Sequence, residues 1–278
     1  MQLQVFLPLV TYPQANSDEI ARSAVCVAQW LEGKLHALAI NADIPDVSTA
    51  LSRVVLNTGE LIKGAETESR HRGSHLLSLL NRTADAAGLP IQTSSIQVHL
   101  ATLGDTAANH ARYFDMSVLG WEPENPTTRS TAEAVIFGAG RPAVICPAVS
   151  AIDEFDHVSI AWDGSRAAAR AVADAQPFLK RAARITIITI TGEKPLGDQH
   201  GAVRLTEILR QSGLNAEARS VAANHRPIAE MLQQTAIEQG SQLLVMGGYG
   251  HSRIRDFVLG GATRGVLASP LLPILLSH

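Results

Sequence analysis

The sequence has little of several features that mark particular classes of protein. It contains only two cysteines, Cys26 and Cys146, far apart in apolar stretches, which argues against a disulfide scaffold and favours a reducing compartment. No apolar run approaches the ~18–20 residues that a bilayer crossing needs, and the first residues lack the basic leader of a signal peptide. The formal net charge of −3 argues against nucleic acid as a partner. We therefore expect a cytoplasmic protein with neither membrane nor nucleic acid as a partner.

Length and composition indicate a globular protein of two domains. The chain has 278 residues, of which 46% are hydrophobic and 18% are charged. Disordered chains have a much lower apolar fraction, so disorder is excluded. A single average domain is shorter than this chain, which is long enough for two domains of about 100–150 residues each.

The second half of the sequence repeats the order of patterns in the first half. Strand-like runs at Val5–Val10 and Val158–Asp163 are each followed by an alanine-rich helical pattern, at Ala21–Gly33 and Ser165–Ala182. Further matching strands and helices follow, in pairs, at Lys34–Ile40 and Arg184–Ile190, 64–88 and 202–212, Thr93–His99 and Asn215–Val221, Asp105–Asp115 and Pro227–Gln239, Met116–Trp121 and Leu243–Gly248, and Arg141–Ala148 and Leu272–His278. Alternating strands and helices predict an α/β protein with parallel sheets and helices on both faces. A single ten-stranded sheet is an alternative, but a duplication with domains 1–150 and 151–278 explains the repeated order better.

A glycine-rich loop follows the fourth predicted strand of the second half. Gly247, Gly248 and Gly250 come directly after the strand, and Gly260 and Gly261 open the next helix. Glycines let backbone N–H groups approach an anion, and a helix N-terminus adds oriented donors for phosphate. The alternative is that the glycines only permit tight turns. The loop is neither a Walker loop nor a GxGxxG dinucleotide motif.

The second half resembles the universal stress protein family at this loop. Gly247-x-x-Gly250, nine residues and then Gly260 match the family's nucleotide-binding pattern G-x2-G-x9-G-[S/T], and Asp163-Gly164-Ser165 also fits. The resemblance extends over the whole chain as a tandem pair. It implies two doubly wound, parallel five-stranded sheets of strand order 3-2-1-4-5 that pack as a pseudo-dimer. Family members commonly dimerise, so the resemblance also raises the alternative of a homodimer. One position departs from the pattern, because Gly261 stands where the family has Ser or Thr, which removes a hydroxyl donor to phosphate.

The resemblance also implies a site for ATP or another adenine nucleotide, with or without Mg²⁺, in the second half. Asp163 is similar to the family's aspartate on the ribose and adenine side, with Ala161 and Trp162 beside the base. Ile190 resembles the residue whose backbone meets adenine. The remaining implied contacts are those to the ribose, Met246 and Gly247, and those to the phosphates, Gly250, His251, Gly260, Gly261, Ala262 and Thr263.

The matching loop of the first half lacks the features of a phosphate site. One glycine remains, Gly120, and the residues after it include Glu122, Glu124 and two prolines. Prolines lack a backbone donor, and carboxylates repel phosphate. We therefore expect the first half to be a degenerate copy that acts as a structural partner.

The function that we expect is nucleotide binding by a stress-response sensor or regulator, without catalysis. The alternatives are a protein-interaction module in which both sites are degenerate, and a slow ATPase in which Asp163 acts as a general base. Asp163 could also be a turn residue that caps the following helix. His71 and His75, four residues apart on a predicted helix, could bind a metal, but a solvated polar face explains them better.

Overall fold

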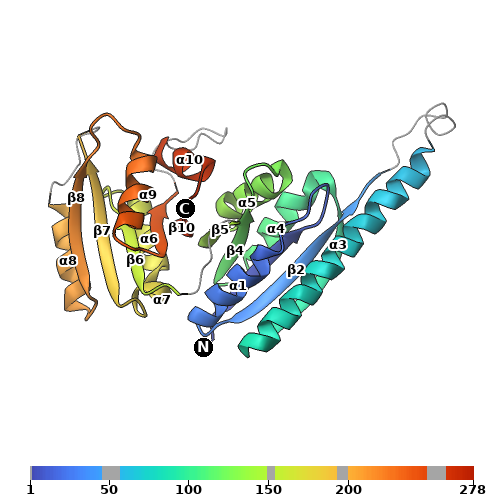
Figure 1. Ribbon diagram of the computed structural model, residues 1–278, viewed down its shortest axis with the longest axis horizontal. Coiled ribbons are helices and arrows are strands. Elements are labelled where there is room, and N and C mark those ends of the chain that lie inside the picture. Colours follow the sequence, from blue (N-terminus) through green and yellow to red (C-terminus); the bar gives the residue numbers. More distant parts are fainter. Residues whose placement is uncertain (1, 46–56, 149–153, 193–199, 249–260) are drawn as a thin grey trace. The chain divides into compact units, whose positions relative to one another are not determined.

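The computed structural model, drawn in Figure 1, describes residues 2–45, 57–148, 154–192, 200–248 and 261–278. The chain divides into two compact units, Met1–Arg141 (unit 1) and Pro142–His278 (unit 2). Strands and helices alternate in both, so the predicted α/β class with mostly parallel strands is confirmed.

Unit 1 contains four parallel strands in the order β3-β2-β1-β4. All of β4 is buried, as expected for a parallel strand that helices cover on both faces. α1 packs with α3 and α4 packs with α5, and right-handed crossovers place these pairs on opposite faces. Figure 1 shows α3 running along β2. The elements are β1 (Gln4–Val10), α1 (Glu19–Trp30), β2 (Lys34–Asp43), α3 (Thr58–Ala87), β3 (Ile91–His99), the 3₁₀ turn η1 (Leu100–Thr102), α4 (Leu103–Ala111), β4 (Met116–Trp121) and α5 (Pro126–Gly138).

Unit 2 repeats this arrangement, with strands in the order β5-β10-β9-β6-β7-β8. α9 packs with α10, while α6 contacts β9 and β10 and α8 contacts β7 and β8. The elements are β5 (Ala143–Pro147), β6 (His157–Ala161), α6 (Arg166–Asp174), α7 (Gln176–Leu179), β7 (Arg184–Thr191), α8 (Gly201–Gln211), β8 (Ala216–Ala222), α9 (Ile228–Glu238), β9 (Leu243–Gly247), α10 (Gly261–Ala268) and β10 (Ile274–Ser277).

β5 is the exception to the parallel pattern. It pairs antiparallel with β10, with Ile145 opposite Ile274. Both residues are fully buried, so the backbone groups of these strands need hydrogen-bond partners away from water. This pairing groups β5, the last strand of the first repeat, with unit 2.

The helix predicted at Ser165–Ala182 is in fact two helices. α6 ends at Asp174 and α7 begins at Gln176, next to Pro177. Proline has no N–H for the ladder and clashes with the preceding turn, so a continuous helix is interrupted here. Phe178 of α7 is fully buried and meets Phe155 edge to face, with ring centroids 5.2 Å apart. Among the described helices, none is both long and apolar enough to cross a membrane.

Candidate functional site

The candidate site lies at the edge of the unit 2 sheet where the parallel strands end. β6 lies between β7 and β9, so the chain crosses the sheet in opposite directions on the two sides of β6. Open α/β sheets bind ligands at such a switch point. Ala161 of β6 is opposite Ile188 of β7, and Ile160 is opposite Val245 of β9. The segments that follow these three strands therefore share one edge.

The turn from β6 into α6 is held by two side chains. Oδ1 of Asp163 accepts a hydrogen bond from the Ser165 backbone N–H at 2.9 Å, and Gly164 takes a positive φ of 77°. The Ser165 hydroxyl accepts from the Ala168 N–H at 3.1 Å and is the N-cap of α6. Asp163 is thus a turn residue, with Ser165 as the cap. Its side chain is also exposed, so the carboxylate can face a ligand.

Trp162 continues the strand by backbone contacts. Its N–H donates to the Ile188 carbonyl at 2.8 Å, and its carbonyl accepts from the Thr189 hydroxyl at 3.0 Å. The indole Nε1 is buried and has no hydrogen-bond partner among the described residues.

Ala161, Ile190 and Ile228 form an apolar platform at the same edge. All three are partly buried and pack on a buried cluster, so part of their apolar surface faces outward. The flat face of a heterocyclic base fits a surface of this kind. The buried cluster beneath the platform consists of Ile188, Leu232, Ala236, Leu244 and Leu272.

The two described motif glycines have different environments. A Cβ on Gly247 would lie 2.5 Å from the Ala167 carbonyl carbon, so this glycine is required where β9 meets the first turn of α6. A Cβ on Gly261 would have no atom of the described residues within 4 Å. Gly247 therefore fits the turn and packing alternative directly, whereas Gly261, the first residue of α10, is exposed among the described residues.

The other predicted residues are partly accounted for. Met246 and Thr263 are each 4% exposed, and Ala262 is partly buried. Gly250, His251 and Gly260 lie outside the described residues. The phosphate side of the predicted site is therefore described only from Gly261 onward, at the N-terminus of α10, where a helix offers free backbone donors.

Sequence reasoning missed a cavity of about 570 Å³ at the ends of β7 and β8. It begins one residue after Ile190 and ends one residue before Ile228, so it adjoins the apolar platform. The available signal was position, because loops after adjacent parallel strands meet at one edge. Its lining residues are Thr191, Gly192, Ala222, Ala223, Asn224, His225, Arg226 and Pro227.

The matching edge of unit 1 contains a carboxylate of the chain itself. Glu122 follows β4, and its Oε1 accepts from the Ser17 backbone N–H at 3.0 Å. Its Oε2 accepts from Asn16 Nδ2 at 3.2 Å, while Asn16 Oδ1 accepts from the Val10 N–H at 2.8 Å. Glu122 thus uses donors that a bound anion would otherwise need. This network links the loop after β1 to the end of β4.

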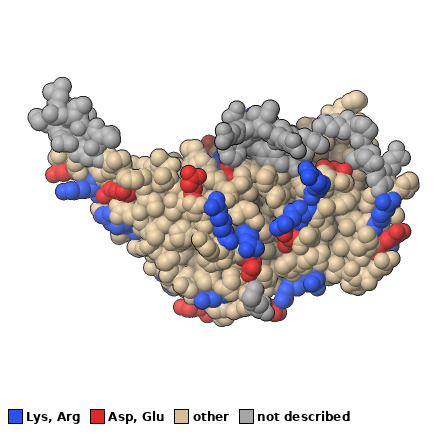
Figure 2. All heavy atoms as spheres, turned by 180° about the vertical axis from the view of Figure 1, so that it is seen from behind, with Lys and Arg blue, Asp and Glu red and all other residues tan. Residues whose placement is uncertain are grey.

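Several charged side chains elsewhere are paired locally. Figure 2 shows basic and acidic residues close together on the face drawn, separated by wide uncharged areas. Ion pairs four residues apart include Arg72–Glu68, Arg170–Asp174 and Arg226–Glu230. His75, one of the two histidines considered for a metal, lies 2.9 Å from an oxygen of Asp18, the residue before α1. Exposed pairs such as these contribute little to stability.

The fold and the site define a doubly wound α/β protein with a candidate ligand site at the strand ends of its second unit. Residues 154–278 match the model of the universal stress protein family. The whole chain is similar to a relative, the universal stress protein Slr1230 of Synechocystis sp. (strain ATCC 27184 / PCC 6803 / Kazusa). The two are 24% identical over 293 residues, which covers 94% of this chain and 96% of the relative.

Two solved structures resemble the chain along its length. A universal stress protein from Archaeoglobus fulgidus DSM 4304 has a TM-score of 0.72 and 16% identity, covering 99% of this chain and 96% of its own. A putative universal stress protein from Pseudomonas aeruginosa UCBPP-PA14 has a TM-score of 0.56 and 13% identity, covering 99% and 93%. At these identities the likeness shows the fold alone.

Proposed function

We propose that unit 2 binds one adenine nucleotide, ATP, ADP or AMP, and that the protein is a stress-response sensor or regulator rather than an enzyme. The observation that carries the proposal is the shared edge of β6, β7 and β9. The exposed Asp163 turn, the platform with Ile190 and the open N-terminus of α10 at Gly261 all follow those strands. The family match over residues 154–278 supports it independently.

Each group at this edge suits one part of a nucleotide. The base would lie on the apolar platform. Asp163 would accept hydrogen bonds from ribose hydroxyls, and the backbone N–H groups at Gly261 and Ala262 would meet phosphate oxygens. A nucleotide combines an apolar ring with an anionic tail. The apolar platform suits the ring, and the N-terminus of α10 suits the tail.

Asp163→Asn tests the ribose contact without disturbing the turn. The amide oxygen of Asn can still accept from the Ser165 N–H, but the charge is lost. We expect ATP affinity to fall about 10-fold, which corresponds to roughly 1.4 kcal/mol for a weakened charged hydrogen bond. Isothermal titration calorimetry with ATP, ADP and AMP, with and without Mg²⁺, measures this. Asp156→Asn, an exposed change just before β6 at the opposite edge, should leave affinity unchanged. Equal affinities of wild type and Asp163→Asn would exclude the ribose contact.

Gly261→Ser tests the phosphate contact by adding a donor. A Cβ fits at this position without moving any described atom, so the hydroxyl can be added at no steric cost. We expect ATP to bind about 10-fold more tightly, because a hydroxyl donating to a charged oxygen contributes roughly 1.5–3 kcal/mol at most. Gly261→Ala adds the same carbon without the hydroxyl and should not tighten binding. The same affinity in the Ser and Ala variants would contradict a phosphate at this helix end.

A further inference from the structure

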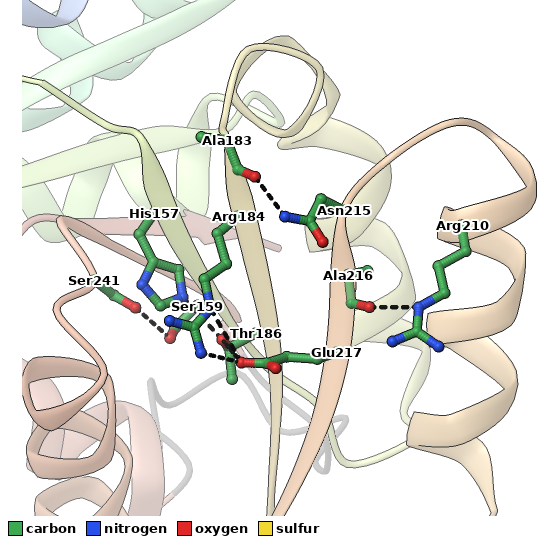
Figure 3. Close-up of polar contacts among 10 residues, drawn as sticks. All are labelled: His157, Ser159, Ala183, Arg184, Thr186, Arg210, Asn215, Ala216, Glu217 and Ser241. Atoms are coloured by element: carbon green, nitrogen blue, oxygen red, sulfur yellow. Dashed lines mark hydrogen bonds and ion pairs between the residues drawn. The ribbon is translucent and has the colours of Figure 1, made fainter.

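The opposite edge of unit 2, where β6, β7 and β8 begin, contains a line of polar side chains that the proposed nucleotide site does not use. His157 starts β6, Thr186 lies near the start of β7, and Glu217 lies opposite Thr186 on β8. Figure 3 shows their side chains pointing toward one another, with Arg184 beside them. His157 is 7% exposed and Thr186 is fully buried. The cluster therefore connects a buried imidazole to a carboxylate at the surface.

The contacts form a chain from the imidazole to the carboxylate. His157 Nε2 lies 2.8 Å from the Thr186 hydroxyl oxygen, which lies 3.3 Å from Oε1 of Glu217. Arg184 Nε donates to the same Glu217 oxygen at 3.1 Å. The backbone of Gln239 also raises the pKa of His157. Since Nε2 faces Thr186, Nδ1 is the ring nitrogen on the other side.

The Thr186 hydroxyl has one proton and can donate it to only one neighbour. If neutral His157 carries its proton on Nδ1, Thr186 donates to Nε2 and not to Glu217. When His157 is protonated, Nε2–H must donate to Thr186, and the hydroxyl then donates to Glu217. Protonation thus reverses the direction of the His157–Thr186 hydrogen bond and allows the Thr186–Glu217 hydrogen bond to form, without moving a heavy atom.

We propose that His157, Thr186 and Glu217 form a proton-dependent relay that makes unit 2 sensitive to acid. At a pH above the pKa of His157, the relay joins β6 and β7 through an uncharged imidazole. Below it, a buried cation is connected to Glu217 through Thr186, and Glu217 is shared with Arg184. The relay is independent of nucleotide binding, so neither proposal depends on the other.

Burial and the charges around His157 decide in which direction the pKa of its imidazole shifts. Burial is the largest influence and lowers the pKa of His157, and Arg184 on β7 lowers this pKa further. The Gln239 backbone and Glu217 on β8 oppose this and raise the pKa. Toward α9 and β9, the described contacts are to Gln239 and to Gln242, whose Oε1 accepts from the His157 N–H at 2.7 Å. Both residues are uncharged, so Glu217 is the described anion that stabilises the protonated ring.

A lowered folded-state pKa means that the unfolded chain binds the proton more readily. The stability from neutral His157 is therefore complete above the unfolded-state pKa of about 6.5. It is lost as the pH falls from there toward the lower pKa of the folded state. We expect the melting temperature of the full chain, without nucleotide, to fall between pH 7.5 and pH 5.5.

Histidine NMR of the full chain tests the relay directly. With resonances assigned by comparison with His157→Gln, we expect His157 to be the Nδ1–H tautomer at pH 8 and to titrate below 6.5. Glu217→Gln removes the anion and should lower the midpoint by about 0.5–1 unit. Thr186→Val removes the hydroxyl and should also lower it. Glu230→Gln breaks an ion pair of similar exposure on α9 and should not change it.

Two outcomes would overturn the proposal. One is a His157 that titrates at or above 6.5 or is the Nε2–H tautomer at pH 8. The other is a midpoint that neither Glu217→Gln nor Thr186→Val changes. If His157→Gln folds, its melting temperature should depend less on pH than that of wild type. If it does not fold, the Glu217→Gln titration, assigned by two-dimensional spectra, still decides the question.

Discussion

At the scale of single residues, the turn that joins β8 to α9 contains an unfavourable backbone conformation. Asn224 and His225 both have positive φ, 47° and 65°, although neither is glycine. The Arg226 N–H donates to the Ala223 carbonyl at 2.9 Å and closes the turn. A non-glycine residue in the left-handed region costs roughly 1–2 kcal/mol, and such strain concentrates at functional sites. These residues line the cavity beside the proposed base platform.

His225→Gly should relieve this strain. We expect His225→Gly to be more stable than His225→Ala by about 1 kcal/mol, because both remove the imidazole but only glycine accepts the positive φ freely. Urea unfolding of the two variants measures the difference. A more stable alanine variant would show that the turn is not strained in solution.

Glu122 is the residue that most clearly distinguishes the strand-end chemistry of unit 1 from that of unit 2. Removing its carboxylate leaves the Ser17 N–H and the Asn16 amide without their acceptor. We expect Glu122→Ala to destabilise the protein by about 1.5–3 kcal/mol, as for hydrogen bonds to charged groups. Glu122→Gln keeps one acceptor oxygen and should lose less. Unchanged thermal melting in Glu122→Ala would refute the contribution of this network to stability.

At the scale of elements, helix packing in unit 2 depends on small residues. A Cβ on Gly265 of α10 would lie 2.5 Å from the Cβ of Ala229 on α9. We expect Gly265→Ala to destabilise the protein by about 1–3 kcal/mol through overpacking. Ala229→Gly in the same chain should recover most of that loss, since it removes the clashing atom. A double-mutant cycle by urea unfolding measures the coupling. Additive effects would contradict direct contact between these helices.

The sequence predicts most elements to within a few residues, because burial on both faces of parallel strands and helical periodicity leave clear patterns. Met116–Trp121 is predicted with the bounds of β4. The break between α6 and α7 was missed although Pro177 is its cause. The antiparallel pairing of β5 with β10 could not be predicted, because a buried apolar strand has the same pattern in either direction.

The candidate site was predictable only where a motif or a strand end marks it. The order of strands brings the segments after β6, β7 and β9 to one edge, as the doubly wound fold requires. The contacts of Glu122 and of His157 depend on side chains from distant segments, and no local pattern encodes them. Gly247 is the opposite case: the local motif marks this residue, and the structure shows that it also has a packing role.

At the scale of the whole molecule, the repeat gives two units that share a central strand and helix order, β1 to β4 in unit 1 and β6 to β9 in unit 2, and differ in strand-end chemistry. Unit 1 places Glu122 on the donors of its own loop, whereas unit 2 has the exposed Asp163 and the open Gly261. This difference leads us to expect one nucleotide per chain, in unit 2. The packing of the halves as a pseudo-dimer, and any homodimer, stay predictions.

The most direct test of the central claim is native mass spectrometry of the full chain with ATP, ADP and AMP, with calorimetry on the same preparation. We expect one adenine nucleotide per chain, bound less tightly in Asp163→Asn and as tightly in Glu122→Gln as in wild type. No binding of any of the three at millimolar concentration, or two nucleotides per chain, would contradict it.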